Sequence, residues 1–204
     1  MILIGYGGHS FVAYGILNAE GKLVTGYFDN EKKEFNPFDL QYLGSEKSDE
    51  ALNFLNSNDF FISVGDNNIR KHIYDYLASK QRLPINAIHP SAIISKDSHL
   101  ISKGVMISAG VIINPLTKID DGVICNTGCI IEHECIIGPF AHIGPGAILC
   151  GNTKIGEKTF VGAGAVIRHG ITIGNNVIIG AGSVVVKNIA DNTTVMGCPA
   201  KPYS

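Results

Sequence analysis

The chain reads VICNTG, CIIEHE, CIIGPF and AHIGPG over residues 123–146, four of the consecutive hexapeptides that run from Val111 to Asn188. The third position of every hexapeptide is apolar. A period of six fits neither an α-helix nor an alternating strand. It is typical of a β-solenoid, in which each hexapeptide forms one short strand and one turn. If three hexapeptides complete one triangular coil, residues eighteen apart stack in three core columns: Cys125, Ile143, Val161 and Ile179; Ile131, Leu149, Ile167 and Val185; and Ile119, Ile137, Ile155 and Ile173.

Glycine fills the fourth position in many of these hexapeptides, at residues 138, 144, 156, 162, 174 and 180. We expect the chain to turn there, where a Cβ would be costly. The six-residue period begins earlier, near Ala92, with Ile94, Leu100 and Met106 at the third position. One additional residue at Gly110 shifts the phase, and we interpret it as a bulge between coils.

The first 88 residues follow a different pattern, in which short apolar strands alternate with helices. Residues 1–4 form an apolar strand, the glycine-rich turn GYGGHS follows, and then comes an amphipathic helix that Ser10 could cap. Further strands are predicted at 22–28, 59–64 and 85–88, with helices at 48–58 and after GDNN. The last helix should bury a face of Ile69, Ile73, Tyr76 and Leu77. This alternation predicts a small parallel sheet.

The sequence therefore predicts two domains, an α/β Rossmann-like domain over residues 1–88 and a β-solenoid over residues 89–204. Ligands of parallel α/β sheets bind at the carboxyl ends of the strands. Three loops should meet there: Gly7, Gly8 and His9; Asp29 and Asn30; and Gly65 with Asp66. Glycines allow the backbone to approach a diphosphate, and an acidic residue about twenty positions later suits a ribose or base.

Composition excludes several classes of function. The formal net charge is −2, with 16 Lys and Arg against 18 Asp and Glu, so no nucleic-acid footprint is indicated. No apolar run is long enough to span a membrane, and the start MILIGYGG lacks the basic region of a signal peptide. The 5 Cys include no C-x-x-C pair. An odd number of cysteines at core-like positions favours reduced thiols and a cytoplasmic location.

The hexapeptide CIIEHE breaks the pattern of the repeat. Glu132, His133 and Glu134 place three ionisable side chains at one corner, where neighbouring hexapeptides read Gly-Pro-Phe or Gly-Pro-Gly. Positions that break local rules are often functional. Histidine is the side chain best suited to proton transfer near neutral pH, and a neighbouring carboxylate can orient it. We predict that His133 is a general base supported by Glu134.

His169 lies thirty-six residues after His133, so the two should stack two coils apart with Gly151 between them. His142 should point outward from the solenoid. The spacing of His133 and His169 also suggests the zinc sites of γ-class carbonic anhydrases, but the position five after His169 is Gly174 rather than histidine. The third ligand is missing, so we predict no metal.

Several motifs together resemble a known family: GGHS, FDN, VGDNN, IEHECIIG, AHIGPGA and GCPAK. The chain resembles the hexapeptide-repeat acetyltransferases of the sialic-acid O-acetyltransferase-like family. Within that family it is most similar to the UDP-4-amino-sugar N-acetyltransferases of bacterial bacillosamine synthesis. The resemblance covers nearly the whole chain. It implies a left-handed parallel β-helix, a homotrimer with active sites between subunits, acetyl-CoA as acetyl donor and a UDP-amino-sugar as acceptor.

The resemblance also assigns roles to individual residues. It implies that His133 is the general base and that Glu134 supports it. The residues implied to contact acetyl-CoA are Asn126, His142, Gly151, Ala163 and Ala181. The residues implied to contact the UDP-sugar are Gly7, Gly8, His9, Asp29, Asn30 and Gly65.

Three other functions remain open from the sequence. An O-acetyltransferase acting on sialic acid or another sugar would share the solenoid and His133 but would not need UDP. A non-catalytic scaffold would use the solenoid only to display the first domain, and would not bind acetyl-CoA. A metal-dependent lyase or hydratase would contain zinc.

Overall fold

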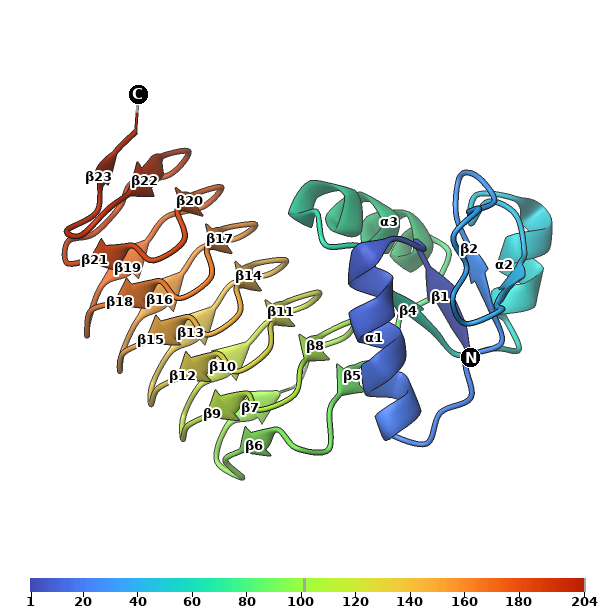
Figure 1. Cartoon of the computed structure of the whole chain (residues 1–204), viewed down its shortest axis with the longest axis horizontal. Coiled ribbons are helices and arrows are strands. Elements are labelled where there is room, and N and C mark those ends of the chain that lie inside the picture. Colours follow the sequence, from blue (N-terminus) through green and yellow to red (C-terminus); the bar gives the residue numbers. More distant parts are fainter. Residues whose placement is uncertain (101, 204) are drawn as a thin grey trace.

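A computed structural model describes residues 1–100 and 102–203, without the side chain of Leu100. Figure 1 shows two parts, a small α/β domain and a long coil of stacked short strands. The α/β domain contains a parallel sheet in the order β3-β2-β1-β4. Its strands are β1 (Ile2–Ile4), β2 (Gly26–Phe28), β3 (Gln41–Tyr42) and β4 (Phe60–Ile62), and its helices are α1 (Gly8–Ala19), α2 (Asp49–Leu55) and α3 (Asn67–Ser79).

The helix starts differ in part from the prediction. Ser48 caps α2 as expected, because its side chain accepts a hydrogen bond from the backbone N–H of Ala51 at 3.1 Å. The cap of α1 is Gly7, and Ser10 is buried inside the helix, so the predicted serine cap is wrong. The predicted face of α3 is confirmed at Ile73 and Leu77, which are buried, but it is wrong at Ile69, which is 54% exposed while Arg70 is buried instead.

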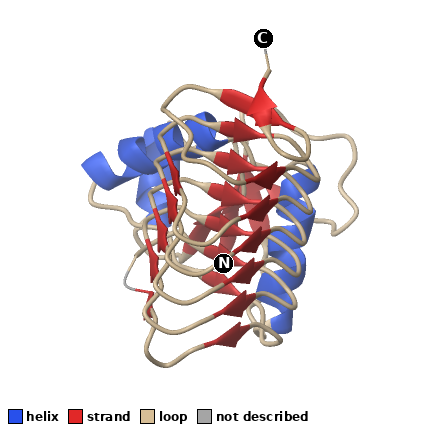
Figure 2. Ribbon diagram, turned by 90° about the vertical axis from the view of Figure 1, so that its left-hand side faces the viewer, coloured by secondary structure: helices blue, strands red, loops and turns tan. Residues whose placement is uncertain are grey.

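The coil is the predicted left-handed parallel β-helix, and three sheets form its faces (Figure 2). We name them the docking sheet, the aliphatic sheet and the third sheet. The docking sheet contains β5 (Ala87–Ile88), β8 (Met106–Ile107), β11 (Ile124–Cys125), β14 (His142–Ile143), β17 (Phe160–Val161), β20 (Ile178–Ile179), β22 (Thr194–Met196) and β23 (Lys201–Pro202). The aliphatic sheet contains β6 (Ile93–Ile94), β9 (Ile112–Ile113), β12 (Ile130–Ile131), β15 (Ile148–Leu149), β18 (Val166–Ile167) and β21 (Val184–Val185). The third sheet contains β7 (His99–Leu100), β10 (Lys118–Ile119), β13 (Ile136–Ile137), β16 (Lys154–Ile155) and β19 (Thr172–Ile173).

The three predicted core columns are confirmed. Strands eighteen residues apart pair in parallel, and every side chain of the columns is at most 3% exposed. The strand predicted at 85–88 does not close the first sheet, because β5 pairs with β8 and begins the coil. The domain boundary between residues 88 and 89 stays a prediction.

The predicted bulge at Gly110 is wrong. Ile88 pairs with Ile107, nineteen residues later, whereas Ile107 pairs with Cys125, eighteen residues later. The extra residue therefore lies between β7 and β8, a segment that includes residue 101, which is outside the described residues. Met106 consequently points out of the coil, and Ile107 takes its place in the core.

The turning residue is the sixth of each hexapeptide rather than the fourth. Residues six apart from Gly104 to Gly182 have positive φ, including Gly122, Glu134, Phe140 and Lys158. The fourth-position glycines have no such φ. They are small because the next coil is close: a Cβ on Gly144 would fall 2.5 Å from the carbonyl oxygen of Val161.

The α/β domain packs on the docking sheet, with α1 beside β5 and β8 (Figure 1). Met106 and Ile124, which point outward from this sheet, are buried in one cluster with Ala13 and Leu17 of α1. The docking sheet meets the aliphatic sheet at the glycine corner (126–128, 144–146, 162–164, 180–182). The aliphatic sheet meets the third sheet at the histidine corner (132–134, 150–152, 168–170). The third sheet meets the docking sheet at the carbonyl corner (120–122, 138–140, 156–158, 174–176).

Candidate functional site

His133 and Glu134 form a hydrogen-bonding contact at the histidine corner. His133 Nδ1 lies 3.0 Å from Glu134 Oε2, and the two side chains are 50% and 56% exposed. Glu134 occupies the left-handed position of its hexapeptide with φ +60°, where several neighbouring hexapeptides have glycine. A non-glycine residue there is strained. The contact favours the tautomer with hydrogen on Nδ1 and leaves Nε2 as a free base.

Gly151 lies under the ring of His133. A Cβ on Gly151 would fall 2.5 Å from His133 Nε2. The ring centroids of His133 and His169 are 6.3 Å apart, so the predicted stack of these three residues is confirmed. Because residue 151 is glycine and has no side chain, the imidazole of His133 can lie along the corner.

A pocket of about 260 Å³ opens at the carboxyl ends of the strands of the first sheet. Of the residues predicted to bind a nucleotide, Gly7, Gly8, His9, Asp29 and Gly65 line it, whereas Asn30 does not. Asp29 Oδ2 accepts a hydrogen bond from the backbone N–H of Tyr6 at 2.8 Å. Glycine backbone and the first turn of α1 therefore face the space in which a diphosphate would fit.

The sequence did not point to two residues of this pocket, Lys33 and Ser63. Lys33 Nζ lies 3.2 Å from Asp29 Oδ1, so a cation borders the pocket. The only hint in the sequence was that Lys33 lies four residues after Asp29, a spacing that allows the two side chains to meet. Ser63 donates a hydrogen bond to the carbonyl oxygen of Gly5 at 2.6 Å, which ties two of the loops together.

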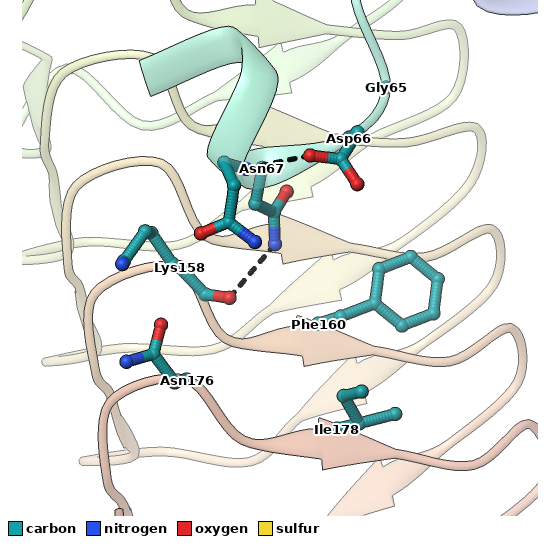
Figure 3. Close-up of a pocket in the computed structure, with 8 residues that line it drawn as sticks. Gly65, Asp66, Asn67, Lys158, Phe160, Asn176 and Ile178 are labelled. Atoms are coloured by element: carbon teal, nitrogen blue, oxygen red, sulfur yellow. Dashed lines mark hydrogen bonds between the residues drawn. The ribbon is translucent and has the colours of Figure 1, made fainter. Parts of the chain in front are cut away.

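A second pocket, of about 330 Å³, lies between the start of α3 and the docking sheet (Figure 3). Phe160 and Ile178 form its apolar floor, and Asp66, Asn68, Lys158 and Asn176 supply polar groups. Gly65 lines both pockets, so the two cavities are neighbours.

Two histidines meet where the domain contacts the solenoid. The rings of His9 and His142 are 5.7 Å apart, and His142 Nε2 lies 3.1 Å from Asn126 Nδ2. Burial and the charge of Arg70 together lower the pKa of His9 to about 4 and that of His142 to about 3. Both imidazoles are therefore neutral at pH 7. His142 points outward as predicted, but the α/β domain leaves it only 7% exposed.

This pair predicts a loss of stability in mild acid. A histidine in the unfolded chain has a pKa of about 6.5. Below that pH, His9 and His142 bind protons in the unfolded chain but stay unprotonated in the folded chain. Stability should fall as the pH drops from about 6.5 to about 4, with His142 contributing on the order of a few kcal/mol. Thermal unfolding between pH 7 and pH 4 would measure this. His142→Phe should flatten the profile, and an equally steep profile in that variant would contradict the assignment.

The residues predicted to bind a cofactor lie at two different corners. Asn126, Ala163 and Ala181 lie at the glycine corner, where Ala163 and Ala181 are exposed. Gly151 lies at the histidine corner with His133. The glycine corner presents a column of small residues along the coil, whereas the histidine corner carries His133, Gly151 and His169.

The predicted catalytic pair and nucleotide pocket of one chain lie on opposite sides of the solenoid. The α/β domain covers the docking sheet, and His133 follows β12 and precedes β13, at the corner opposite that sheet. The hydrophobic core separates them. A ligand in the pocket of one chain therefore cannot reach the His133 of the same chain.

Within residues 1–100 and 102–203, no group of three or more His, Cys, Asp or Glu side chains is placed to hold a metal ion. The same described part of the chain contains no helix of the length and apolarity needed to cross a membrane.

Comparisons with known proteins match both parts of the chain. Residues 1–77 match the family model described as the PglD N-terminal domain. Residues 152–187 match the bacterial transferase hexapeptide model. UDP-N-acetylbacillosamine N-acetyltransferase of Bacillus subtilis (strain 168) is 36% identical over 109 residues, 52% of this chain and 50% of that protein. The match thus spans half the length of this curated relative.

Solved structures match over the whole chain. One is a histidine variant of perosamine N-acetyltransferase from Caulobacter crescentus in complex with CoA and GDP-perosamine. Its sequence is 35% identical to this chain, the TM-score is 0.92, and the match covers 100% of this chain and 96% of that chain. The acetyltransferase domain of PglB from Neisseria gonorrhoeae FA1090, in complex with acetyl coenzyme A, is 34% identical with a TM-score of 0.89, covering 99% and 98%.

Proposed function

Because this chain belongs to the family of hexapeptide-repeat sugar N-acetyltransferases that includes these relatives, we propose that it moves an acetyl group from acetyl-CoA to the 4-amino group of a UDP-4-amino-4,6-dideoxy-N-acetylhexosamine. The observation that carries this proposal is the half-exposed His133–Glu134 pair on a solenoid that also supports a nucleotide-sized pocket. The free thiols of its cysteines suit the cytoplasm.

The nucleotide occupies the pocket at the strand ends, with its diphosphate against Gly7, Gly8 and the first turn of α1. Asp29 and Lys33 border the base and ribose. The sugar extends past Gly65 into the neighbouring pocket, where Phe160 offers an apolar surface to a deoxy sugar. GDP is a second candidate nucleotide, because one relative that matches the whole chain was solved in complex with GDP-perosamine.

His133 acts on the amine of the acceptor. An amino group with a pKa of about 8, by analogy with an α-amine, is largely protonated at neutral pH. His133 Nε2 removes a proton as the nitrogen attacks the thioester carbonyl. The new N–C bond forms, the C–S bond breaks, and the thiolate of CoA leaves and takes up the second proton that the nitrogen loses. A backbone N–H at the glycine corner near Asn126 stabilises the oxyanion.

The cysteines do not form an acyl-enzyme in this proposal. Cys125, Cys129 and Cys135 are buried in the core. Burial raises the pKa of the Cys135 thiol to about 11. A hydrogen bond between the Cys125 S–H and Cys129, together with burial, raises the pKa of Cys125, so neither residue is a ready thiolate. Direct attack of the amine on acetyl-CoA therefore suffices.

A homotrimer assembles the complete site. The outward side chains of the aliphatic sheet form a continuous stripe of partly exposed aliphatic residues: Ile93, Ile112, Ile130, Ile148, Val166 and Val184. Neighbouring copies packed on this stripe would cover it. The histidine corner adjoins the same sheet, so the His133 of one chain would border the glycine corner and the nucleotide pocket of its neighbour.

The direct test measures thiol release from acetyl-CoA with a UDP-linked 4-amino-4,6-dideoxy sugar, its GDP-linked counterpart and free sialic acid. Release with the UDP-sugar alone is the expected result. Release with the GDP-sugar alone would change the nucleotide, and release with sialic acid alone would favour the O-acetyltransferase. No release, together with no binding of acetyl-CoA, would favour the scaffold. Stoichiometric zinc by elemental analysis would favour the metal-dependent lyase or hydratase.

Gly8→Trp should abolish nucleotide binding without unfolding the chain. A Cβ on Gly8 would meet no atom within 4 Å, so a side chain fits there, and the indole would fill the pocket. Calorimetry with UDP should show at least a 10²-fold loss of affinity, on the order of 3 kcal/mol, while the melting temperature stays close to wild type. Gly15→Trp, also with open space and on the same helix, is the matched control. Undiminished UDP binding by Gly8→Trp would place the nucleotide elsewhere.

Gly151→Ala should lower kcat with little effect on stability. The added methyl group would meet the imidazole of His133, which can rotate away, so the cost falls on the position of Nε2 rather than on folding. A displacement of about 1 Å should reduce kcat by up to about 10²-fold. Steady-state kinetics and thermal unfolding would measure both quantities. An unchanged kcat would mean that the ring does not need its place over Gly151.

A further inference from the structure

Helix α3 holds three successive coils of the solenoid at the carbonyl corner. Gly122, Phe140 and Lys158 are spaced by eighteen residues and have φ values of +62°, +58° and +56°. Arg70 Nε donates to the carbonyl oxygen of Gly122 at 2.8 Å, and Arg70 Nη2 donates to that of Phe140 at 2.8 Å. Asn67 Nδ2 donates to the carbonyl oxygen of Lys158 at 2.9 Å (Figure 3). Arg70 and Asn67, one helical turn apart, therefore bind the stacked carbonyl groups of three successive coils.

The same arginine holds the loop that precedes α3. Its Nη1 donates to the carbonyl oxygens of Val64 and Gly65 at 3.1 and 3.0 Å, and its Nη2 donates to Asn67 Oδ1 at 2.8 Å. Arg70 is 1% exposed, and these contacts use all its N–H donors. Every acceptor is neutral, which is costly for a buried charge. A lysine has three donors on a single nitrogen and cannot reproduce this fork.

We propose that Arg70, with Asn67, is a positioning residue that sets the register of the nucleotide-binding domain along the solenoid. Gly65, which Arg70 holds, lines both the nucleotide pocket and its neighbour. A slip of one coil would move the domain by about 4.8 Å. The catalytic consequence rests on the function proposed above: the register decides whether the amine of the bound sugar reaches the height of the acetyl donor.

Arg70→Lys keeps the positive charge and removes the fork, so it tests this role. We expect kcat to fall by about 10²-fold, because a 1 Å misplacement can cost that much. The Kd for UDP by calorimetry and the KM for acetyl-CoA should each stay within about twofold, since the nucleotide pocket and the solenoid corners remain intact. Arg82→Lys, just beyond the C-terminal end of the same helix, is the matched control and should leave all three quantities unchanged.

A purely structural role would give a different result. In that case Arg70→Lys would lower the melting temperature but leave kcat unchanged well below it, and the proposal would be overturned. Should Arg70→Lys fail to fold, Asn67→Leu removes the Lys158 contact and one of the five acceptors of Arg70, and it should lower kcat by about tenfold through partial loss of register. An unchanged kcat in that variant would equally overturn the proposal.

Chemical rescue separates register from stability. Guanidinium ion added to folded Arg70→Ala should restore part of kcat without changing the KM for acetyl-CoA, and no recovery of kcat would count against the proposal. The wild-type assay distinguishes failure of the proposed function from failure of the proposed positioning role of Arg70. Absence of acetyl transfer by the wild type would reject the function, whereas transfer that Arg70 variants leave unaltered would reject only the positioning role.

Discussion

His133→Ala is expected to lower kcat by about 10²–10⁴-fold while the oligomer and the melting temperature stay unchanged, because a general base contributes in this range. The side chain is 50% exposed, so its loss leaves no cavity in the core. Thiol release under saturating acetyl-CoA, with size-exclusion chromatography of the same sample, would measure both properties.

His169→Ala is the matched control for this variant. It removes an imidazole from the same corner, two coils further along, with no described contact to Glu134. Its kcat should stay within a few-fold of wild type. A rising pH should recover part of the activity of His133→Ala, because more of the amine is then unprotonated without a base. Turnover like that of wild type in His133→Ala would remove the proposed base from the mechanism.

Two inactive variants should restore activity when they are combined in one oligomer. His133→Ala lacks the base but keeps its nucleotide pocket, and Gly8→Trp lacks the pocket but keeps the base. Because the two proposed sites of one chain lie on opposite sides of the solenoid, we expect each active site to combine two chains. In randomly mixed trimers about a quarter of the sites would pair an intact pocket with an intact base. Activity of that order after co-expression is the expected result.

The double variant carrying both substitutions on one chain is the control for complementation. Mixed with wild type at equal amounts, it should leave about a quarter of the sites functional, whereas alone it should be inactive. If co-expressed single variants regain no activity although mass spectrometry detects mixed oligomers, the site must be formed within one chain. Ile130→Asp on the aliphatic stripe should prevent mixing in the first place, since it would bury a charge in the subunit contact.

Much of the solenoid could be predicted from local pattern. The period of six determines which side chain points inward, so the columns of Cys125, Ile131 and Ile119 are found where expected. The same pattern failed at Met106, which is as apolar as a core residue but points outward beneath the α/β domain. Hydrophobicity alone cannot distinguish burial inside the coil from burial between the two domains. Counting Met106 as a core residue keeps the period of six intact up to that point, and the extra residue is then predicted at Gly110 instead of before Met106.

Part of the candidate site was also accessible from sequence, because strand ends and their loops are local features. Gly7, Gly8, His9, Asp29 and Gly65 meet at one edge as the order of strands and helices predicts. Lys33 was missed because its approach to Asp29 depends on how the loop after β2 folds back. Tyr6 is buried and stacks on Tyr27 with ring centroids 4.2 Å apart, so its side chain belongs to the core of the α/β domain.

The sequence by itself determined the coil, the cluster at His133 and the loops of the nucleotide pocket, since each depends on residues close together in the chain. Only the tertiary structure decided that Arg70 is buried against two coils, that His9 meets His142, and that His133 lies opposite the pocket. These are contacts between segments fifty or more residues apart, or relations between whole faces. They follow from how the domain docks on the solenoid, and no local periodicity encodes that docking.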